Sequence, residues 1–221
     1  MTVGFVTQQG SRPAPLTIAR WLPVAIVAGL LLGPLDLWGQ VVAPYPWAHL
    51  FNSPAVWAAG AFAFGRWARD RIASPVGAVV LLVVAVEAYY LADVLFRDAD
   101  SGNLTSPTAM VWLVAGVIAG LVFGTAGWWS ASPSGWQAVV GRAALPAVFA
   151  AEAVRDVVRI VRGPADSRSD DLGQLAAILA VLAVATFVAL VRGTDRRVGV
   201  AVAAVTLVAA LAVGLVAGTV L

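Results

Sequence analysis

Residues 74–96 of the chain read SPVGAVVLLVVAVEAYYLADVLF, a stretch that is almost entirely apolar. A helix rises 1.5 Å per residue, and crossing the hydrocarbon core of a bilayer takes about 20 residues, so this stretch is long enough to cross. Similar runs precede and follow it, separated by short segments rich in Pro, Gly, Ser and Asp. The pattern predicts an all-α fold, a polytopic transmembrane helical bundle.

The composition agrees with this fold class. Apolar residues make up 61% of the chain and charged residues 12%, whereas a soluble domain carries about 25% charged residues. The chain has no Cys and one His, His49, which excludes thiolate catalysis and argues against a His-based metal site. We expect no cofactor and no metal. No basic stripe is present, so we also expect no nucleic-acid partner.

About seven spans are predicted, at residues 21–37, 47–67, 74–96, 107–129, 136–161, 172–191 and 198–221. Residues 1–20 are expected to form a cytoplasmic tail, and residues 21–221 a single multi-pass domain in the cell membrane. The second span is the least secure because Pro54 interrupts its start. Arginines are more frequent in the connections on the side of the N-terminus, which predicts an N-in/C-out orientation.

Small residues recur at helical spacing. Gly29 and Gly33 share a face of the first span, and Gly116, Gly120 and Gly124 share a face of the fourth. Such faces let helix backbones approach closely where no hydrophobic force drives them together in lipid. We expect these faces to pack within the chain. A homo-oligomer interface is the alternative.

Carboxyl groups inside predicted spans are the first functional signal, because a charge in hydrocarbon costs several kcal/mol. Glu87 and Glu152 each lie about nine residues before the end of their helix, which places both roughly 14 Å deep. We expect the two to face a shared interior between the third and fifth spans. Asp93, Asp156 and Asp36 lie toward the same side, and they complete the set of candidate catalytic acids.

For the charged residues of the fifth span, a purely structural role is an open alternative. Glu152, Arg155, Asp156 and Arg159 fall on one stripe of their helix. The two arginines would then neutralise the two acids as i,i+3 and i,i+4 pairs in an ion network.

Aromatic side chains are the second functional signal. Most of the nine Trp fall at span ends, as an interfacial belt requires. The others lie near the acids, and together with Tyr and Phe residues and one amide they would wall an apolar pocket. Faces of Trp and Tyr attract cations. The pocket therefore suits either carbocation chemistry or an apolar or cationic ligand. The candidate substrate-binding residues are Trp38, Trp57, Tyr89, Tyr90, Trp112, Phe149 and Asn52.

Three segments carry a resemblance: FNSPAVWAAGAFAFGRWARD at 51–70, AYY at 88–90 and LPAVFAAEA at 145–153. They resemble a family of small actinobacterial polytopic membrane proteins. In length, helix pattern, intramembrane carboxyls and Trp and Tyr content, the chain is similar to the integral membrane terpene cyclases of bacterial meroterpenoid pathways, including the drimentine type.

The resemblance implies a metal-independent, protonation-initiated (class II-like) terpene cyclase acting on a prenylated small molecule. A carboxyl would protonate an alkene of the prenyl chain, and aromatic faces would stabilise the migrating cation. The alternative is a proton-coupled transporter, or a membrane subunit that binds a solute or lipid. Against transport, no pair of interrupted helices is evident in the sequence.

Overall fold

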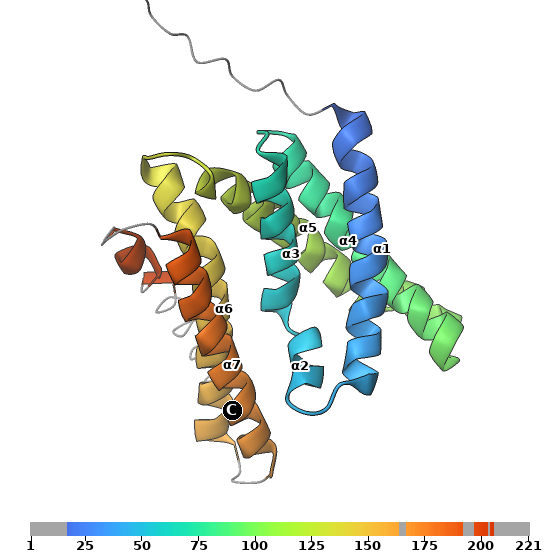
Figure 1. Ribbon diagram of the computed structural model, residues 1–221. Coiled ribbons are helices and arrows are strands. Elements are labelled where there is room, and N and C mark those ends of the chain that lie inside the picture. Colours follow the sequence, from blue (N-terminus) through green and yellow to red (C-terminus); the bar gives the residue numbers. More distant parts are fainter. Residues whose placement is uncertain (1–16, 164–166, 192–196, 203, 206–221) are drawn as a thin grey trace, which may run out of the picture.

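A computed structural model describes residues 17–163, 167–191, 197–202 and 204–205, the side chains of 167–169 excepted. The described chain is all-α, as predicted (Figure 1). Its elements are α1 (Ile18–Val42), α2 (Trp47–Phe51), α3 (Pro54–Ala68), α4 (Ala73–Arg97), the 3₁₀ helix η1 (Ser101–Thr105), α5 (Pro107–Ser130), α6 (Trp136–Arg162) and α7 (Ser167–Leu190).

Helix α4 is the centre of the bundle. It packs against α1 and α5, and the short helix α3 lies against both α4 and α5. Helices α6 and α7 form an antiparallel pair that contacts the rest of the bundle mainly through α5 (Figure 1). Helices α4 and α6 are not among the helix pairs that pack extensively, because α3 and α5 lie between them.

The glycine faces lie at helix contacts within the chain, as predicted. Side chains at Gly29 and Gly33 would collide with the backbone of α4, at Leu81 and Ala85 respectively. Gly124 lies against Ser74 of α4, and it also meets α3. These close approaches explain why α1 and α5 can flank α4 so tightly.

The second predicted span is interrupted. Residues 47–67 form two helices, α2 and α3, separated by Asn52 and Ser53. Pro54 occupies the first turn of α3, where its missing N–H costs nothing, and Ser53 is the N-cap. Because the break is near the middle of the bundle, α3 is only 15 residues long and its N-terminus lies inside the protein.

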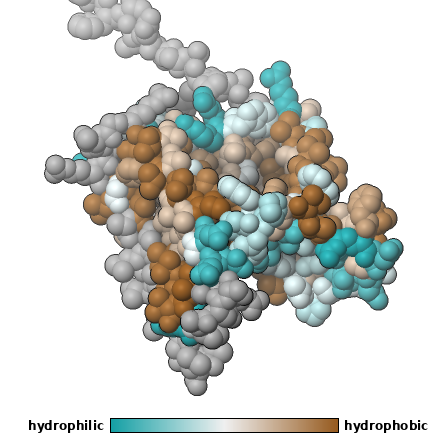
Figure 2. All heavy atoms as spheres, turned by 60° about the horizontal axis from the view of Figure 1, so that its bottom comes forward, coloured by the Kyte–Doolittle hydropathy of each residue, from teal (hydrophilic) through white to brown (hydrophobic). Residues whose placement is uncertain are grey.

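Within the described residues, four helices are long and apolar enough to cross a membrane: α1, α4, α5 and residues Asp170–Leu190 of α7. Helix α3 is too short to be among them, and α6 carries charges along its second half. Large apolar side chains are exposed on all four of these helices. Figure 2 shows broad apolar areas on one face of the molecule, with hydrophilic residues gathered in patches between them.

Some predictions lie partly outside the described residues. Helix α1 begins at Ile18, within the predicted tail of residues 1–20, of which 1–16 are not described. The seventh predicted span is described only at 198–202 and 204–205, where the chain is helical. The number of seven spans and the N-in/C-out orientation stay predictions.

Candidate functional site

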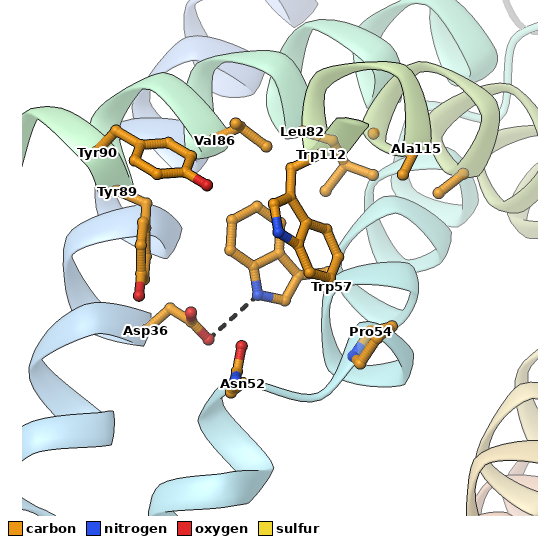
Figure 3. A pocket seen from close by; sticks show the side chains of 12 residues that line it. Asp36, Asn52, Pro54, Trp57, Leu82, Val86, Tyr89, Tyr90, Trp112 and Ala115 are labelled. Carbon is orange, nitrogen blue, oxygen red and sulfur yellow. Dashed lines mark hydrogen bonds between the residues drawn. The ribbon is translucent and has the colours of Figure 1, made fainter. Parts of the chain in front are cut away.

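A cavity of about 310 Å³ lies where α3 begins, bounded by α1, α4 and α5. Because α3 starts part-way along the bundle, it leaves part of the groove between α1 and α5 uncovered, and α4 forms the floor (Figure 3). The lining is mostly apolar and aromatic, with one carboxyl. The lining residues are Asp36, Asn52, Pro54, Trp57, Leu82, Val86, Tyr89, Tyr90, Trp112, Ala115, Gly116 and Ala119.

Asp36 is the acid of this cavity. Its side chain is buried, at 3% exposure. Trp57 Nε1 donates a hydrogen bond to Asp36 Oδ1 at 3.1 Å, and Gln40 Nε2 donates to Oδ2 at 2.9 Å (Figure 3 shows the first). Among the described residues Asp36 forms no ion pair, so both of its partners are neutral donors. This carboxyl is therefore oriented by the protein without being neutralised by it.

The packing of α1 on α4 brings Asp36 to the cavity. Gly29 and Gly33 press α1 against α4, and Asp36 follows Gly33 by three residues on the same helix face. The contact between the two helices thus turns Asp36 inward. Trp57 reaches it from the first turns of α3, so the Asp36–Trp57 hydrogen bond also joins α1 to α3.

The predicted aromatic pocket is present in part. Trp57, Tyr89, Tyr90 and Trp112 line the cavity, together with the predicted amide Asn52. The rings of Tyr89 and Tyr90 meet edge to face, with centroids 5.4 Å apart. In Figure 3 the Tyr90 hydroxyl and the Asn52 side chain point into the space, and Trp112 covers it from the side of α5. Electron-rich rings therefore surround a space beside a buried acid.

Glu87 does not share this interior, which corrects the expectation from its depth. Its side chain is exposed on α4, while the neighbouring Val86 and Tyr90 line the cavity. The depth of a residue along a helix says nothing about which side of the helix it occupies, and the faces of α4 that meet α1, α3 and α5 exclude Glu87. Asp93 lies near the end of α4, where it pairs with Arg97 at 3.3 Å outside the cavity lining.

Glu152 lies elsewhere, at the buried N-terminus of α3. Its Oε2 accepts hydrogen bonds from Ser53 Oγ at 2.8 Å and from the backbone N–H of Ala55 at 2.9 Å. Its Oε1 accepts from Arg155 at 2.8 Å. A carboxylate at a helix N-terminus satisfies N–H groups that have no partner within the helix, and it meets the positive end of the helix dipole. Glu152 and Glu87 are therefore not brought together, and the expected shared interior is wrong.

Asp156 belongs to the same ion network, as the structural reading proposed. It is fully buried, and its Oδ1 lies 3.1 Å from Arg155 and 3.8 Å from Arg159. Its Oδ2 has no hydrogen-bond partner among the described residues. We refer to Glu152, Arg155, Asp156 and Arg159 as the α6 ion network.

Two predicted pocket residues lie outside the cavity. Trp38 is 63% exposed on α1, because it is two residues beyond Asp36 and so faces away from α4. Phe149 is buried in a separate apolar cluster with Leu145, Leu175 and Leu179, where α6 packs on α7. Neither Trp38 nor Phe149 therefore lines the cavity that Asp36 borders.

Gln40 and Pro54 contribute to the site but were not among the predicted site residues. Gln40 follows Asp36 by four residues, a spacing that places two side chains together on a helix. This spacing is the signal from which the hydrogen bond could have been predicted. The remaining missed lining residues are small or aliphatic, and nothing in the sequence distinguishes them from ordinary packing positions: Leu82, Val86, Ala115, Gly116 and Ala119.

The described part of the chain is an α-helical bundle in which four helices are long and apolar enough to cross a membrane, and it contains an aromatic-walled cavity that Asp36 borders. Residues 12–220 match the family described as "Family of unknown function (DUF6518)", and the chain belongs to that family. No curated protein and no solved structure matches the chain.

Proposed function

We propose that this chain is a multi-pass protein of the cell membrane that acts as a terpene cyclase, with Asp36 as the acid that protonates a prenyl chain. The observation that carries the proposal is the Asp36 carboxyl, which is buried, held by two neutral donors and set in a wall of Trp and Tyr rings. A general acid needs this orientation toward the reacting atom.

The reaction would begin with the proton of Asp36 passing to the terminal alkene of the prenyl chain, which leaves a tertiary carbocation. The next alkene attacks this carbon, a C–C bond forms, and the cation moves along the chain until a neighbouring carbon loses a proton. The faces of Trp57, Trp112, Tyr89 and Tyr90 would stabilise the cation. The proton lost from that carbon returns to the Asp36 carboxylate, directly or through solvent, so the acid is regenerated and the product is an isomer of the substrate.

The hydrogen bonds to Asp36 suit this step. Donating the proton leaves a carboxylate, and the N–H groups of Trp57 and Gln40 already point at its two oxygens. Hydrogen bonds to a charged acceptor are stronger than those to a neutral one, so both would strengthen as charge develops. Donors placed in advance at a developing charge lower the barrier.

The test uses purified protein in detergent or lipid nanodiscs with a farnesylated indole or farnesylated cyclodipeptide. Cyclisation would appear as a product of unchanged mass and shifted retention time, and in D₂O the product would gain one deuterium from the acid. Asp36→Asn should lower the rate by about 10²–10⁴-fold, the usual contribution of a general acid. Turnover of Asp36→Asn within a few-fold of the wild type would refute the assignment.

The interrupted second span supports a second candidate, a proton-coupled transporter or a membrane subunit that binds a solute or lipid. Half-helices with buried N-termini form the substrate sites of several transporter folds. In this chain the N-terminus of α3 is already occupied by Glu152. Proton uptake into proteoliposomes, driven by an outward gradient of a small apolar amine, tests this candidate. Uptake together with an absence of turnover would favour it over the cyclase.

A further inference from the structure

The end of the bundle away from the Asp36 cavity carries exposed arginines. The start of α1 and the turn between α3 and α4 lie there, at the top of Figure 1. Three exposed arginines come from these two segments, and we call them the arginine cluster: Arg20, Arg69 and Arg71. Arg20 and Asp36 lie on the same helix and are separated by about 24 Å of its axis, so the cluster is distinct from the cavity.

One apolar core brings the three arginines to the same patch of surface. Trp21, Ala68 and Ala73 all belong to this core, and each lies one or two residues from a different arginine of the cluster. The contact between α1 and α4 is close at this level, because a Cβ added at Gly77 of α4 would lie 3.1 Å from the ring of Trp21. Arginines from separate parts of the sequence therefore surround one site.

No acid of the described chain neutralises the arginine cluster. None of its three side chains takes part in an ion pair among the described residues. Asp70 lies between two of them in sequence, but it caps the start of α4: its Oδ1 accepts hydrogen bonds from the N–H groups of Ile72 at 2.9 Å and Ala73 at 2.7 Å. The cluster therefore presents positive charge to its surroundings.

The backbone does not explain the presence of Arg69. This residue is the C-cap of α3 and has a φ of 51°, in the left-handed region where glycine is the usual residue. A glycine would suit the turn better than an arginine does. The turn by itself therefore gives no reason for an arginine, and the guanidinium group is the feature left to account for it.

Large apolar side chains are interleaved with the arginines. Ile18 is 65% exposed, Trp67 49% and Ile72 68%, and each lies within two residues of an arginine of the cluster. This combination suits the surface of a bilayer, where arginines meet lipid headgroups and neighbouring Trp and aliphatic side chains meet the hydrocarbon edge. A polyanion dissolved in water would leave these apolar side chains uncovered.

We propose that the arginine cluster binds the headgroup phosphate of an anionic phospholipid at the membrane surface. A guanidinium group can donate two parallel hydrogen bonds to phosphate oxygens, which makes arginine well suited to this ligand. A lipid with net negative charge complements the cluster, whereas the ammonium group of a zwitterionic lipid cancels the charge of its phosphate. The inference does not depend on the proposed cyclase function.

The test counts the lipids bound to the purified protein in detergent by native mass spectrometry. The probes are dioleoyl phosphatidylglycerol, which is anionic, and dioleoyl phosphatidylcholine, which is zwitterionic. The wild type should prefer phosphatidylglycerol at least tenfold. The double variant Arg20→Gln/Arg71→Gln should lose most of this preference, because each arginine near an anionic surface contributes about fivefold in affinity. The matched control is Arg97→Gln/Arg162→Gln, which removes two exposed arginines at the opposite end and should keep the preference.

Arg69→Gly separates lipid binding from folding. Glycine suits the left-handed backbone, so the melting temperature in phosphatidylcholine should be equal to or above that of the wild type, while the preference for phosphatidylglycerol falls about fivefold. A preference that stays within twofold of the wild type in both Arg20→Gln/Arg71→Gln and Arg69→Gly overturns the inference. An equal loss in the control variant does so too, because it would mean that net charge alone sets the preference.

Two further measurements locate the lipid and identify the source of the phosphate. A phosphatidylglycerol with a photoreactive headgroup should label the start of α1 and the turn between α3 and α4. Labelling confined to the opposite end of the bundle overturns the inference. Inorganic phosphate at millimolar concentration should not displace the lipid, and displacement would assign the cluster to a soluble phosphate compound instead.

Discussion

Two of the buried acids, Asp36 and Glu152, lie in opposite surroundings. Asp36 meets two neutral N–H donors and borders an aromatic cavity, whereas Glu152 meets a hydroxyl, a backbone N–H and an arginine and borders no described cavity. The residue types are nearly the same, and both groups lie at 7% exposure or less. Their partners differ accordingly: Glu152 holds the start of α3 in place, whereas Asp36 faces a cavity and is the acid that we propose acts on a ligand.

The two roles are connected through α3. Ser53 and Ala55, which bind Glu152, directly flank Pro54, which lines the Asp36 cavity, and Trp57 follows in the next turn. The α6 ion network thus fixes the short helix whose tryptophan orients Asp36. Substitutions on the two sides of α3 should separate an effect on stability from an effect on the ligand.

The largest loss of stability is expected for Glu152→Ala. The change leaves Arg155 and the first turn of α3 without their shared acceptor, and removing one partner of a buried ion pair costs about 3–5 kcal/mol. Thermal unfolding in detergent, followed by size-exclusion chromatography, measures it. Glu152→Gln keeps an oxygen for Ser53 and Ala55 and should lose less. Equal melting temperatures for wild type and Glu152→Ala would contradict the role of Glu152 as a cap.

A smaller loss is expected for Trp57→Phe, which removes the donor to Asp36 and keeps most of the ring. A hydrogen bond between neutral groups contributes about 0.5–1.5 kcal/mol, which is the range that applies while Asp36 carries its proton, and Gln40 remains as the second donor. Trp112→Phe is the control. Trp112 lines the same cavity, but the described hydrogen-bond partners of Asp36 are Trp57 and Gln40. A double-mutant cycle with Asp36→Asn should show coupling for Trp57 and none for Trp112.

Ser53→Ala should cost about 1 kcal/mol, the usual net value of one hydrogen bond. Its hydroxyl is one of three donors to Glu152, and the backbone N–H of Ala55 and the guanidinium of Arg155 remain. Chemical denaturation in mixed micelles can measure the difference. Ser106→Ala, at the N-cap of α5, provides a scale for the loss of two hydrogen bonds, because that hydroxyl accepts from the N–H of Ala109 and donates to the carbonyl of Asn103. A loss for Ser53→Ala as large as that for Glu152→Ala would mean that Ser53 and not Glu152 holds α3.

The smallest effect is expected for Glu87→Gln. Its side chain is exposed and does not line the Asp36 cavity, and substitutions at such sites usually change stability by less than about 0.5 kcal/mol. Melting temperature and turnover should both stay at the wild-type values. A large loss of turnover would show that Glu87 faces a partner or a ligand in the assembled protein, and it would contradict the assignment of Asp36 as the acid.

Much of the architecture could be predicted from local patterns in the sequence. Apolar runs predicted the helices, and Pro54 marked the weak point where the second span breaks into α2 and α3. Gly29, Gly33 and the glycines of α5 predicted close contacts, because a missing side chain acts in the same way whichever helix is the neighbour. The i,i+3 pair of Glu152 and Arg155 was also predictable, since both residues lie on one helix.

Which of the acidic side chains borders the cavity was decided by the tertiary structure alone. Helical periodicity fixes which residues of one helix share a face, but it leaves open how that face turns toward the other helices. Glu87 and Asp36 both lie on apolar helices next to aromatic residues, yet packing of α1 on α4 turned Asp36 inward and left Glu87 outside. The cavity itself exists because α3 begins part-way along the bundle, anchored on Glu152 of a helix almost a hundred residues further along the chain. Contacts between residues so distant in sequence depend on how the helices pack together, which local pattern does not determine.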